Sequence, residues 1–92
     1  MSLHHPTIVI VARDNQRSEV NLDFGIAVRR LRLEAGLSQE ALGVEAGLDR
    51  TYVSGIERGI RNPTLKIISR LANALGASPA QLLDPATAQQ DG

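Results

Sequence analysis

Five positions between residues 50 and 58 carry groups suited to reading a polar surface. On a helix over residues 49–58, positions at i, i+1, i+4, i+5 and i+8 share one exposed face. That face holds Arg50, Thr51, Ser54, Gly55 and Arg58, so it offers guanidinium and hydroxyl groups and no acid. In the DNA major groove, Arg can donate two hydrogen bonds to a guanine edge, and Thr can offer its hydroxyl or touch a thymine methyl. We therefore expect this face to contact base edges.

For this face to stay exposed, the opposite face of the helix has to pack against a neighbouring helix. The pattern predicts a helix over residues 38–46, with Ser38 as its N-cap and Gly47 at its end. Only Gly47 and Leu48 separate the two helices, so we expect a sharp crossing rather than an antiparallel hairpin. Gly43 in the middle of the first helix costs about 1 kcal/mol relative to Ala. That cost indicates that the following helix lies too close for a side chain there.

Apolar residues at three- and four-residue steps predict three further helices. They cover residues 23–35, 65–75 and 80–83, so the expected domain is all-α with five helices. Asp23 is the expected N-cap of helix 23–35 and Ser78 that of helix 80–83. Gly36 is expected to end helix 23–35, and Gly76 to end helix 65–75. The side chains expected to face inward are Phe24, Ala27, Val28, Leu31 and Ala35, then Leu48, Val53, Ile56 and Ile60, then Leu65, Ile68, Leu71, Ala72 and Leu75.

The two ends of the chain lie outside this pattern, so we expect the domain to cover residues 23–84. Residues 7–12, TIVIVA, are mostly β-branched and predict a strand or extended arm. The strand could pair with its copy in a second subunit, lie on its own domain or remain disordered. Residues 13–22 are expected to form a linker, and residues 85–92 a flexible polar tail.

Composition excludes several classes of function. The chain has 92 residues and no cysteine, so it allows one small domain without disulfides or thiolate metal sites. Its only histidines are His4 and His5, which are too few to indicate a metal site, and no nucleophile–base pair or glycine-rich phosphate loop is present. We expect no enzyme activity, no cofactor and no small-molecule ligand. With no apolar run of membrane-spanning length and no secretory signal pattern, a cytoplasmic protein is expected.

Positive charge is concentrated in one part of the chain. The net charge is zero, which by itself argues mildly against a nucleic-acid partner. From residue 50 to residue 70, however, there are five basic residues and one acid, Glu57, whereas the last 22 residues contain no Arg or Lys. The local excess of positive charge coincides with the predicted DNA-reading segment.

Three blocks of this sequence resemble the XRE family, the phage Cro/repressor type of helix-turn-helix. They are RRLRLEAGLSQEALGVEAGL, TYVSGIERGIRNPTL and ISRLANALGASPAQLL. They lie between Phe24 and Leu83, in the family's order and spacing, and cover about 60 of the 92 residues. The block Ser54-x-Ile56-Glu57-x-Gly59-x-x-x-Pro63 is highly specific.

The resemblance implies a five-helix, lambda-repressor-like DNA-binding domain and a role for each matching position. It makes residues 49–58 the recognition helix, with Arg50, Thr51 and Gly55 at base-contacting positions. Gly55 departs from the family's usual longer polar side chain, which would leave that base pair unread or let the backbone approach closer. Ser54 is a base reader or a surface hydroxyl. The positions that match contacts to the DNA backbone are Gln39, Tyr52, Arg58, Arg61 and Asn62, with Lys66 added.

The resemblance also implies that Arg32 and Glu57 form a buried salt bridge, which removes Arg32 from the DNA-binding set. Arg29, Arg30 and Arg70 are expected to be solvated surface residues. The function so implied is a homodimeric transcriptional regulator on a near-palindromic operator. Helix 80–83 and the end of helix 65–75 would form the dimer surface, supplemented by residues 7–12. The alternative is an antitoxin- or adaptor-like module that mainly binds a partner protein. The fold does not separate restriction-modification controllers, phage-type repressors and antitoxins.

Overall fold

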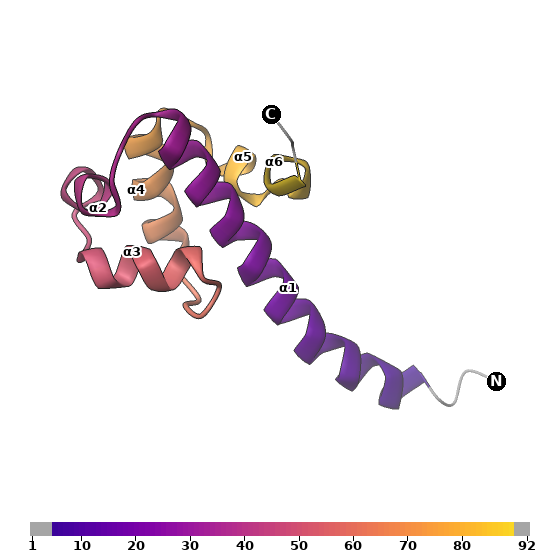
Figure 1. Cartoon of the computed structure of the whole chain (residues 1–92). Helices are drawn as coiled ribbons and strands as arrows, with labels where there is room; N and C mark the ends of the chain where they lie inside the picture. The colour runs from indigo at the N-terminus through magenta and orange to yellow at the C-terminus, as the bar shows by residue number, and fades with distance from the viewer. Residues whose placement is uncertain (1–4, 90–92) are drawn as a thin grey trace.

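The described part of the chain is built from six helices. The computed structural model describes the backbone of residues 5–89 and the side chains of residues 19–89. Figure 1 shows the long helix α1 crossing the molecule, with the other helices packed against its C-terminal half. The helices are α1 (His5–Glu34), α2 (Gln39–Ala46), α3 (Arg50–Glu57), α4 (Leu65–Leu75), α5 (Pro79–Leu83) and α6 (Pro85–Gln89).

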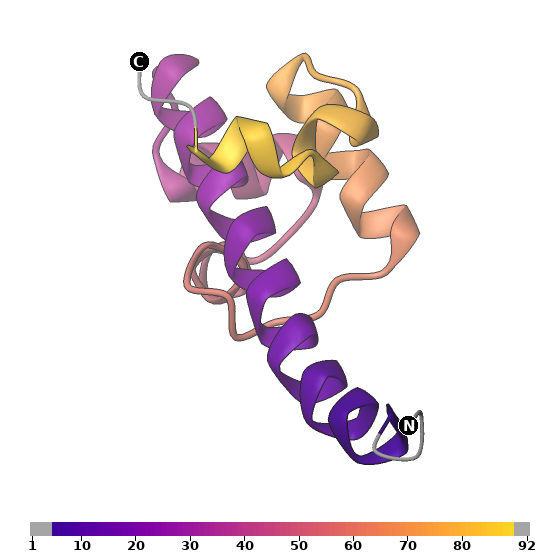
Figure 2. The same cartoon turned by 90° about the vertical axis from the view of Figure 1, so that its right-hand side faces the viewer.

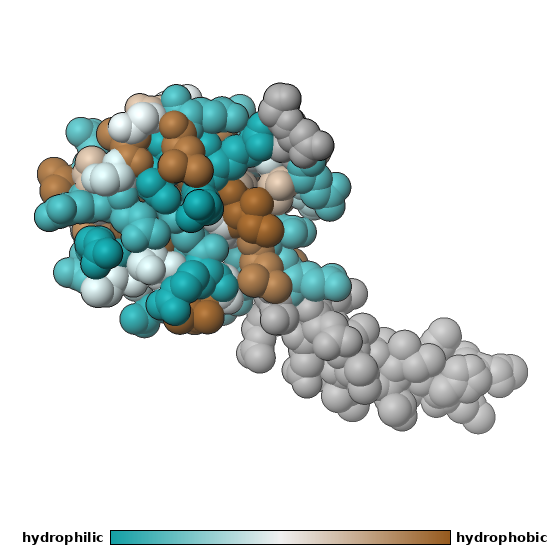
Figure 3. Space-filling view, in the orientation of Figure 1, coloured by the Kyte–Doolittle hydropathy of each residue, from teal (hydrophilic) through white to brown (hydrophobic). Residues whose placement is uncertain are grey.

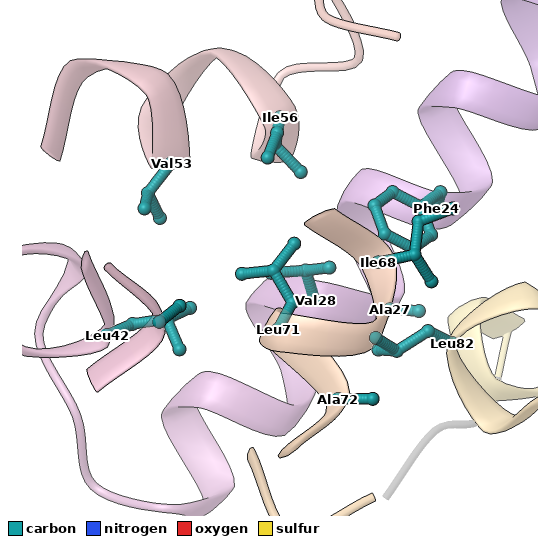
Figure 4. Packing of buried hydrophobic residues seen from close by; sticks show 11 residues of the cluster. Phe24, Ala27, Val28, Leu42, Val53, Ile56, Ile68, Leu71, Ala72 and Leu82 are labelled. Carbon is teal, nitrogen blue, oxygen red and sulfur yellow. The ribbon is translucent and has the colours of Figure 1, made fainter. Parts of the chain in front are cut away.

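One apolar core joins five of these helices. Figure 4 shows side chains from α1, α2, α3, α4 and α5 meeting at its centre. Each helix contributes residues from one face, as the three- and four-residue spacing predicts. Burial of these side chains is the main force that holds α3 in place. The buried residues are Phe24, Ala27, Val28, Leu42, Ala46, Val53, Ile56, Ile68, Leu71, Ala72 and Leu82.

Local capping sets most helix ends where the sequence predicts them. The Ser38 hydroxyl accepts a hydrogen bond from the Ala41 amide at 2.9 Å, and Asp49 caps α3 in the same way. Ser78 forms a capping box with Gln81, and Pro79 occupies the first turn of α5. Gly36, Gly47 and Gly76 all adopt positive φ at helix ends, a conformation that glycine adopts without steric cost.

The expected strand over residues 7–12 and linker over residues 13–22 are wrong, because both segments are helical. They form the N-terminal part of α1, which projects away from the other helices (Figures 1 and 2). A β-branched run is a weak local preference that an adjoining helix can override. No proline interrupts residues 7–34, and Pro6 lies in the first turn of α1, where proline is tolerated. Asp23 therefore lies inside a helix and is not an N-cap.

The predicted tail is also partly helical. Residues 85–89 form α6, which packs against α1 (Figure 2), and Ala88 contacts the core. The Asp84 carboxylate accepts a hydrogen bond from the Ala86 amide at 3.0 Å, and Pro85 begins the helix. This Asp-Pro pair repeats the Ser78-Pro79 signal and could have predicted the sixth helix. His4 and residues 90–92 lie outside the described residues.

Three residues expected to face inward are exposed instead. Ile60 is 63% exposed and Leu65 is 80% exposed, and Ala35 is also on the surface. Gly59 has a φ of +78°, so the helical periodicity of α3 cannot be projected onto Ile60. Leu65 is the first residue of α4. No helical turn precedes it, so no neighbouring side chains of α4 cover it from that end. No helix in residues 5–89 combines the length and the hydropathy that a membrane crossing requires.

Candidate nucleic-acid interface

The link between α2 and α3 is a tight turn with a close backbone approach. Gly47 has a φ of +72°, and the Leu48 amide donates to the Gly43 carbonyl at 2.7 Å. A Cβ atom built on Gly43 would lie 2.5 Å from the Leu48 carbonyl oxygen. Gly43 therefore makes room for a close backbone approach, as predicted, but its closest neighbour is Leu48 in the link, and Arg50 N at the start of α3 lies 3.6 Å away.

Arg70 fastens this turn to α4. Its Nε donates to the Ala46 carbonyl at 3.0 Å, and its Nη2 donates to the Gly47 carbonyl at 2.9 Å. These carbonyls lie at the C-terminal end of α2, where a cation also complements the helix dipole. Arg70 is exposed, as expected, but it also caps the end of α2. Sequence spacing gives no signal for it, because the contact joins residues that are 23 and 24 positions apart.

A second glycine lets α3 lie directly on α1. A Cβ atom on Gly25 would come within 2.8 Å of the Glu57 carbonyl oxygen, and it would also overlap the Ile56 carbonyl. The backbone at the end of α3 therefore rests on α1. Together with Gly43 at the other end of α3, this contact fixes how the helix is oriented on the domain.

The N-terminal end of α3 presents Arg50 and Thr51 to solvent. Both are exposed. The Thr51 amide donates to Asp49 Oδ2 at 2.9 Å, and the Thr51 hydroxyl donates to the same oxygen. These bonds lower the pKa of Asp49 below its ordinary value. Because the hydroxyl proton is committed to Asp49, Thr51 offers a partner its oxygen lone pairs and its methyl group.

Most other predicted contact residues also lie on the surface of α3 or in the segment that follows. Arg58, Arg61, Asn62 and Lys66 are exposed, and Ser54 is partly exposed. The surface over α2 and α3 in Figure 3 is mostly hydrophilic, whereas apolar side chains gather where α1 leaves the globular part. The structure thus places Arg50, Thr51 and Ser54 on α3 and Arg58 at its C-cap, with Arg61 and Asn62 in the loop beyond it.

The placement of Gly55 on the exposed face is wrong. Gly55 is buried, because Arg61 folds back along α3 and covers it. A Cβ atom on Gly55 would lie 2.9 Å from Arg61 Cγ and 3.1 Å from Arg61 Nε. The Arg61 guanidinium carbon then lies 5.2 Å from the centroid of the Tyr52 ring, within the range of a cation–π contact. Gly55 offers neither a side chain nor free surface, so we do not keep it as a base-contacting residue.

Arg32 and Glu57 form the buried ion pair that the family resemblance implies. Arg32 Nε lies 2.6 Å from Glu57 Oε2, and Arg32 Nη2 lies 3.0 Å from Oε1. Both side chains are nearly inaccessible, and Arg32 Nη1 also donates to the Leu37 carbonyl at 2.9 Å. The hydrogen bonds from Arg32 to Glu57 raise the pKa of the guanidinium above its ordinary value. The charge of Glu57 is therefore compensated inside the domain.

Gln39 joins this pair from the start of α2. Its Nε2 donates to Glu57 Oε1 at 3.0 Å, so the pair links α1, α2 and α3. An amide nitrogen has two hydrogens, so one donor of Gln39 remains for a phosphate. Gln39 is thus held in a fixed position at the N-terminal end of α2, where backbone N–H groups favour an anion.

Within the described side chains, no group of three or more His, Asp or Glu is placed to hold a metal ion. The exposed groups near α3 are instead mainly hydrogen-bond donors and cations. This arrangement suits a polyanion with a groove wide enough for a helix.

Comparison with known proteins agrees with this geometry. A helix-turn-helix family model matches residues 28–82. The control protein C.BamHI of Bacillus amyloliquefaciens is 47% identical over 68 residues, which cover 73% of this chain and 84% of that protein. The restriction-modification controller C.AhdI of Aeromonas hydrophila is 51% identical in its crystal structure, with a TM-score of 0.65 over 66% of this chain and 92% of that one.

A third similar protein has been solved with DNA. The controller C.Esp1396I, as a tetramer in complex with its natural 35 base-pair operator, is 36% identical. It superposes with a TM-score of 0.64 and covers 68% of this chain and 83% of that one. The α2–turn–α3 unit and these matches give the same assignment: the chain belongs to the XRE-type helix-turn-helix family of DNA-binding transcriptional regulators.

Proposed function

We propose that this protein is a sequence-specific regulator of the restriction-modification controller type, which binds a near-palindromic operator as a homodimer. The observation that carries the proposal is the outward-facing end of α3, where Arg50 and Thr51 are exposed on a helix fixed from both ends. The similarity to control proteins and controllers supports the narrower class.

In the proposed complex, α3 lies in the major groove. Arg50, Thr51 and Ser54 contact base edges, with Arg50 donating two hydrogen bonds to a guanine. Thr51 accepts a hydrogen bond or contacts a thymine methyl, since its proton is held by Asp49. Contacts to the sugar–phosphate backbone set the register. They come from Gln39, Tyr52, Arg58, Arg61, Asn62 and Lys66.

Dimerisation is proposed through the region of α5. One short helix reads too few base pairs for useful specificity, so two copies are required. Leu83 on α5 is 49% exposed, beside an apolar hollow that is lined by Val20, Phe24 and Leu82. Figure 1 places α5 on the other side of α1 from α3, so two copies joined there would keep both recognition helices free.

Selection of bound duplexes from a random DNA pool tests the proposal. We expect an enriched inverted repeat whose half-sites lie about 10–10.5 base pairs apart, or a multiple of that distance. Affinity for the selected duplex should fall steeply as salt rises, because several phosphates are neutralised. A pool without an enriched motif at low salt would instead favour a protein-binding module.

A matched pair of variants tests the dimer surface. Leu83→Asp should lower the dimer fraction in sedimentation and weaken binding to the full repeat. Val44→Asp changes a side chain that is 77% exposed on α2 and should leave the dimer fraction unchanged. Equal dimer fractions in the two variants would place the interface elsewhere.

A further inference from the structure

The side chain of Arg61 packs on the surface of α3 against Gly55 and Tyr52, a position called the Arg61 site below, although the residue lies in the loop beyond that helix. Arg61 Cγ and Nε pass over Gly55, and the guanidinium reaches the Tyr52 ring. Gly55 and Tyr52 are one helical turn apart, so the side chain runs from the C-terminal half of α3 toward its N-terminal half. Its charged end is therefore brought toward the end of α3 that carries Arg50 and Thr51.

Arg61 can pack at this site because residue 55 has no side chain. Gly55 is in a helix and has no unusual φ, so backbone conformation does not require glycine here. Glycine lowers helix propensity relative to alanine, and no backbone atom is among the three nearest neighbours of a Cβ at this position. What a methyl group would displace is the side chain of Arg61.

We propose that Gly55 and Tyr52 are positioning residues for Arg61, and that they hold its guanidinium ready for a DNA phosphate beside the recognition helix. The proposal rests on the proposed function, since it assigns a role within the same interface. Gly55 has no Cβ atom to block the Arg61 side chain, and the Tyr52 ring supplies an attractive surface for the planar guanidinium cation. An arginine held before binding loses less side-chain entropy when it meets its phosphate.

Gly55→Ala separates this role from a structural one. Alanine favours the helix, and the displaced side chain is exposed, so the free energy of unfolding should stay equal or rise. Affinity for the selected duplex should nevertheless fall about tenfold, as expected for a lost hydrogen bond to a charged group. The slope of log affinity against log salt should also decrease by about one contact. A merely structural glycine would show loss of stability together with loss of affinity.

Arg61→Ala completes a double-mutant cycle. It should weaken binding at least as much as Gly55→Ala, and Gly55→Ala should have no further effect in the Arg61→Ala background. An additive effect would overturn the proposal, because Gly55 would then act without Arg61. Gly43→Ala is the matched glycine control. Its methyl group would clash with the Leu48 carbonyl oxygen, so the variant should be less stable, but Arg61 should keep its contacts with Gly55 and Tyr52.

An NMR measurement on the free protein tests whether Arg61 packs on Tyr52 in the absence of DNA. The ring current of Tyr52 should shift the δ and ε proton resonances of Arg61 upfield in the wild type. Gly55→Ala and Tyr52→Leu should return them to the values of an unstructured arginine. Unshifted resonances in the wild type, or full affinity in Gly55→Ala, would overturn the proposal. Failure of the broader function is distinguishable, because the wild type itself would then select no DNA motif.

Discussion

The guanidinium of Arg32 and the carboxylate of Glu57 meet through two hydrogen bonds, of 2.6 and 3.0 Å, where α1 crosses the end of α3. Both groups are buried, and Gln39 adds a third donor to the carboxylate. The only acid within α3 is thereby kept away from the surface that we propose faces phosphate. The pair ties α1 to the end of α3 and keeps a repulsive charge out of the proposed interface.

Glu57→Ala should lower the free energy of unfolding by about 3 kcal/mol or more, because Arg32 would remain buried without its counter-charge. Chemical denaturation of the wild type and the variant measures this difference. The matched control is Glu34→Ala, which breaks the Arg30–Glu34 pair at the surface and should cost only about 0.3–0.5 kcal/mol. Equal losses in the two variants would contradict the structural role of the buried pair.

Arg70→Met should lower the free energy of unfolding by about 0.5–1.5 kcal/mol, because two carbonyls at the end of α2, one of them exposed, lose a charged donor. The change should also speed hydrogen exchange at the Gly47 and Leu48 amides, since the turn is less firmly held. Arg29→Met at an exposed position of α1 serves as control and should stay within about 0.5 kcal/mol of the wild type.

Gly43→Ala should destabilise the protein by about 1–3 kcal/mol although alanine is the better helix former. The added methyl group would meet the Leu48 carbonyl oxygen, which is part of the backbone and cannot swing aside. Thermal unfolding measures the effect beside Gly55→Ala, where the neighbour is a mobile side chain. A Gly43→Ala variant as stable as Gly55→Ala would mean that the turn can relax.

The cap of α3 should make stability depend on pH in the acidic range. Hydrogen bonds from Thr51 lower the pKa of Asp49 in the folded state. The stabilisation is therefore present above the unfolded pKa of about 3.9 and is lost as the pH falls through the lower folded value. Asp49→Asn keeps a capping oxygen but does not titrate there. The difference in melting temperature between wild type and variant should shrink from pH 6 to pH 3; a constant difference would contradict this assignment.

The features that the sequence predicted correctly are those that depend on local chemistry or on the family resemblance. Ser38, Asp49 and Ser78 cap their helices because a short polar side chain can reach the nearby amides. Gly47 and Gly76 end helices because they adopt positive φ. The Arg32–Glu57 pair joins residues 25 positions apart, and only the resemblance indicated it.

The features that the sequence did not predict depend on contacts between distant residues. The β-branched run over residues 7–12 favours a strand locally, but it forms the N-terminal part of α1, whose C-terminal half packs against the other helices. Burial of Gly55 depends on where the side chain of Arg61 lies, and the role of Arg70 depends on α4 crossing the end of α2. The division of the chain at residues 22 and 84 stays a prediction, as do the individual DNA contacts other than Gly55.

The central claim is that α3 reads DNA sequence directly, and selection from a random duplex pool with Arg50→Ala beside the wild type tests it most directly. We predict that the wild type enriches an inverted repeat and that the variant loses preference at one symmetric position in each half-site, while the other positions persist. The same motif recovered with every position intact, or no motif from the wild type, would contradict direct readout by Arg50.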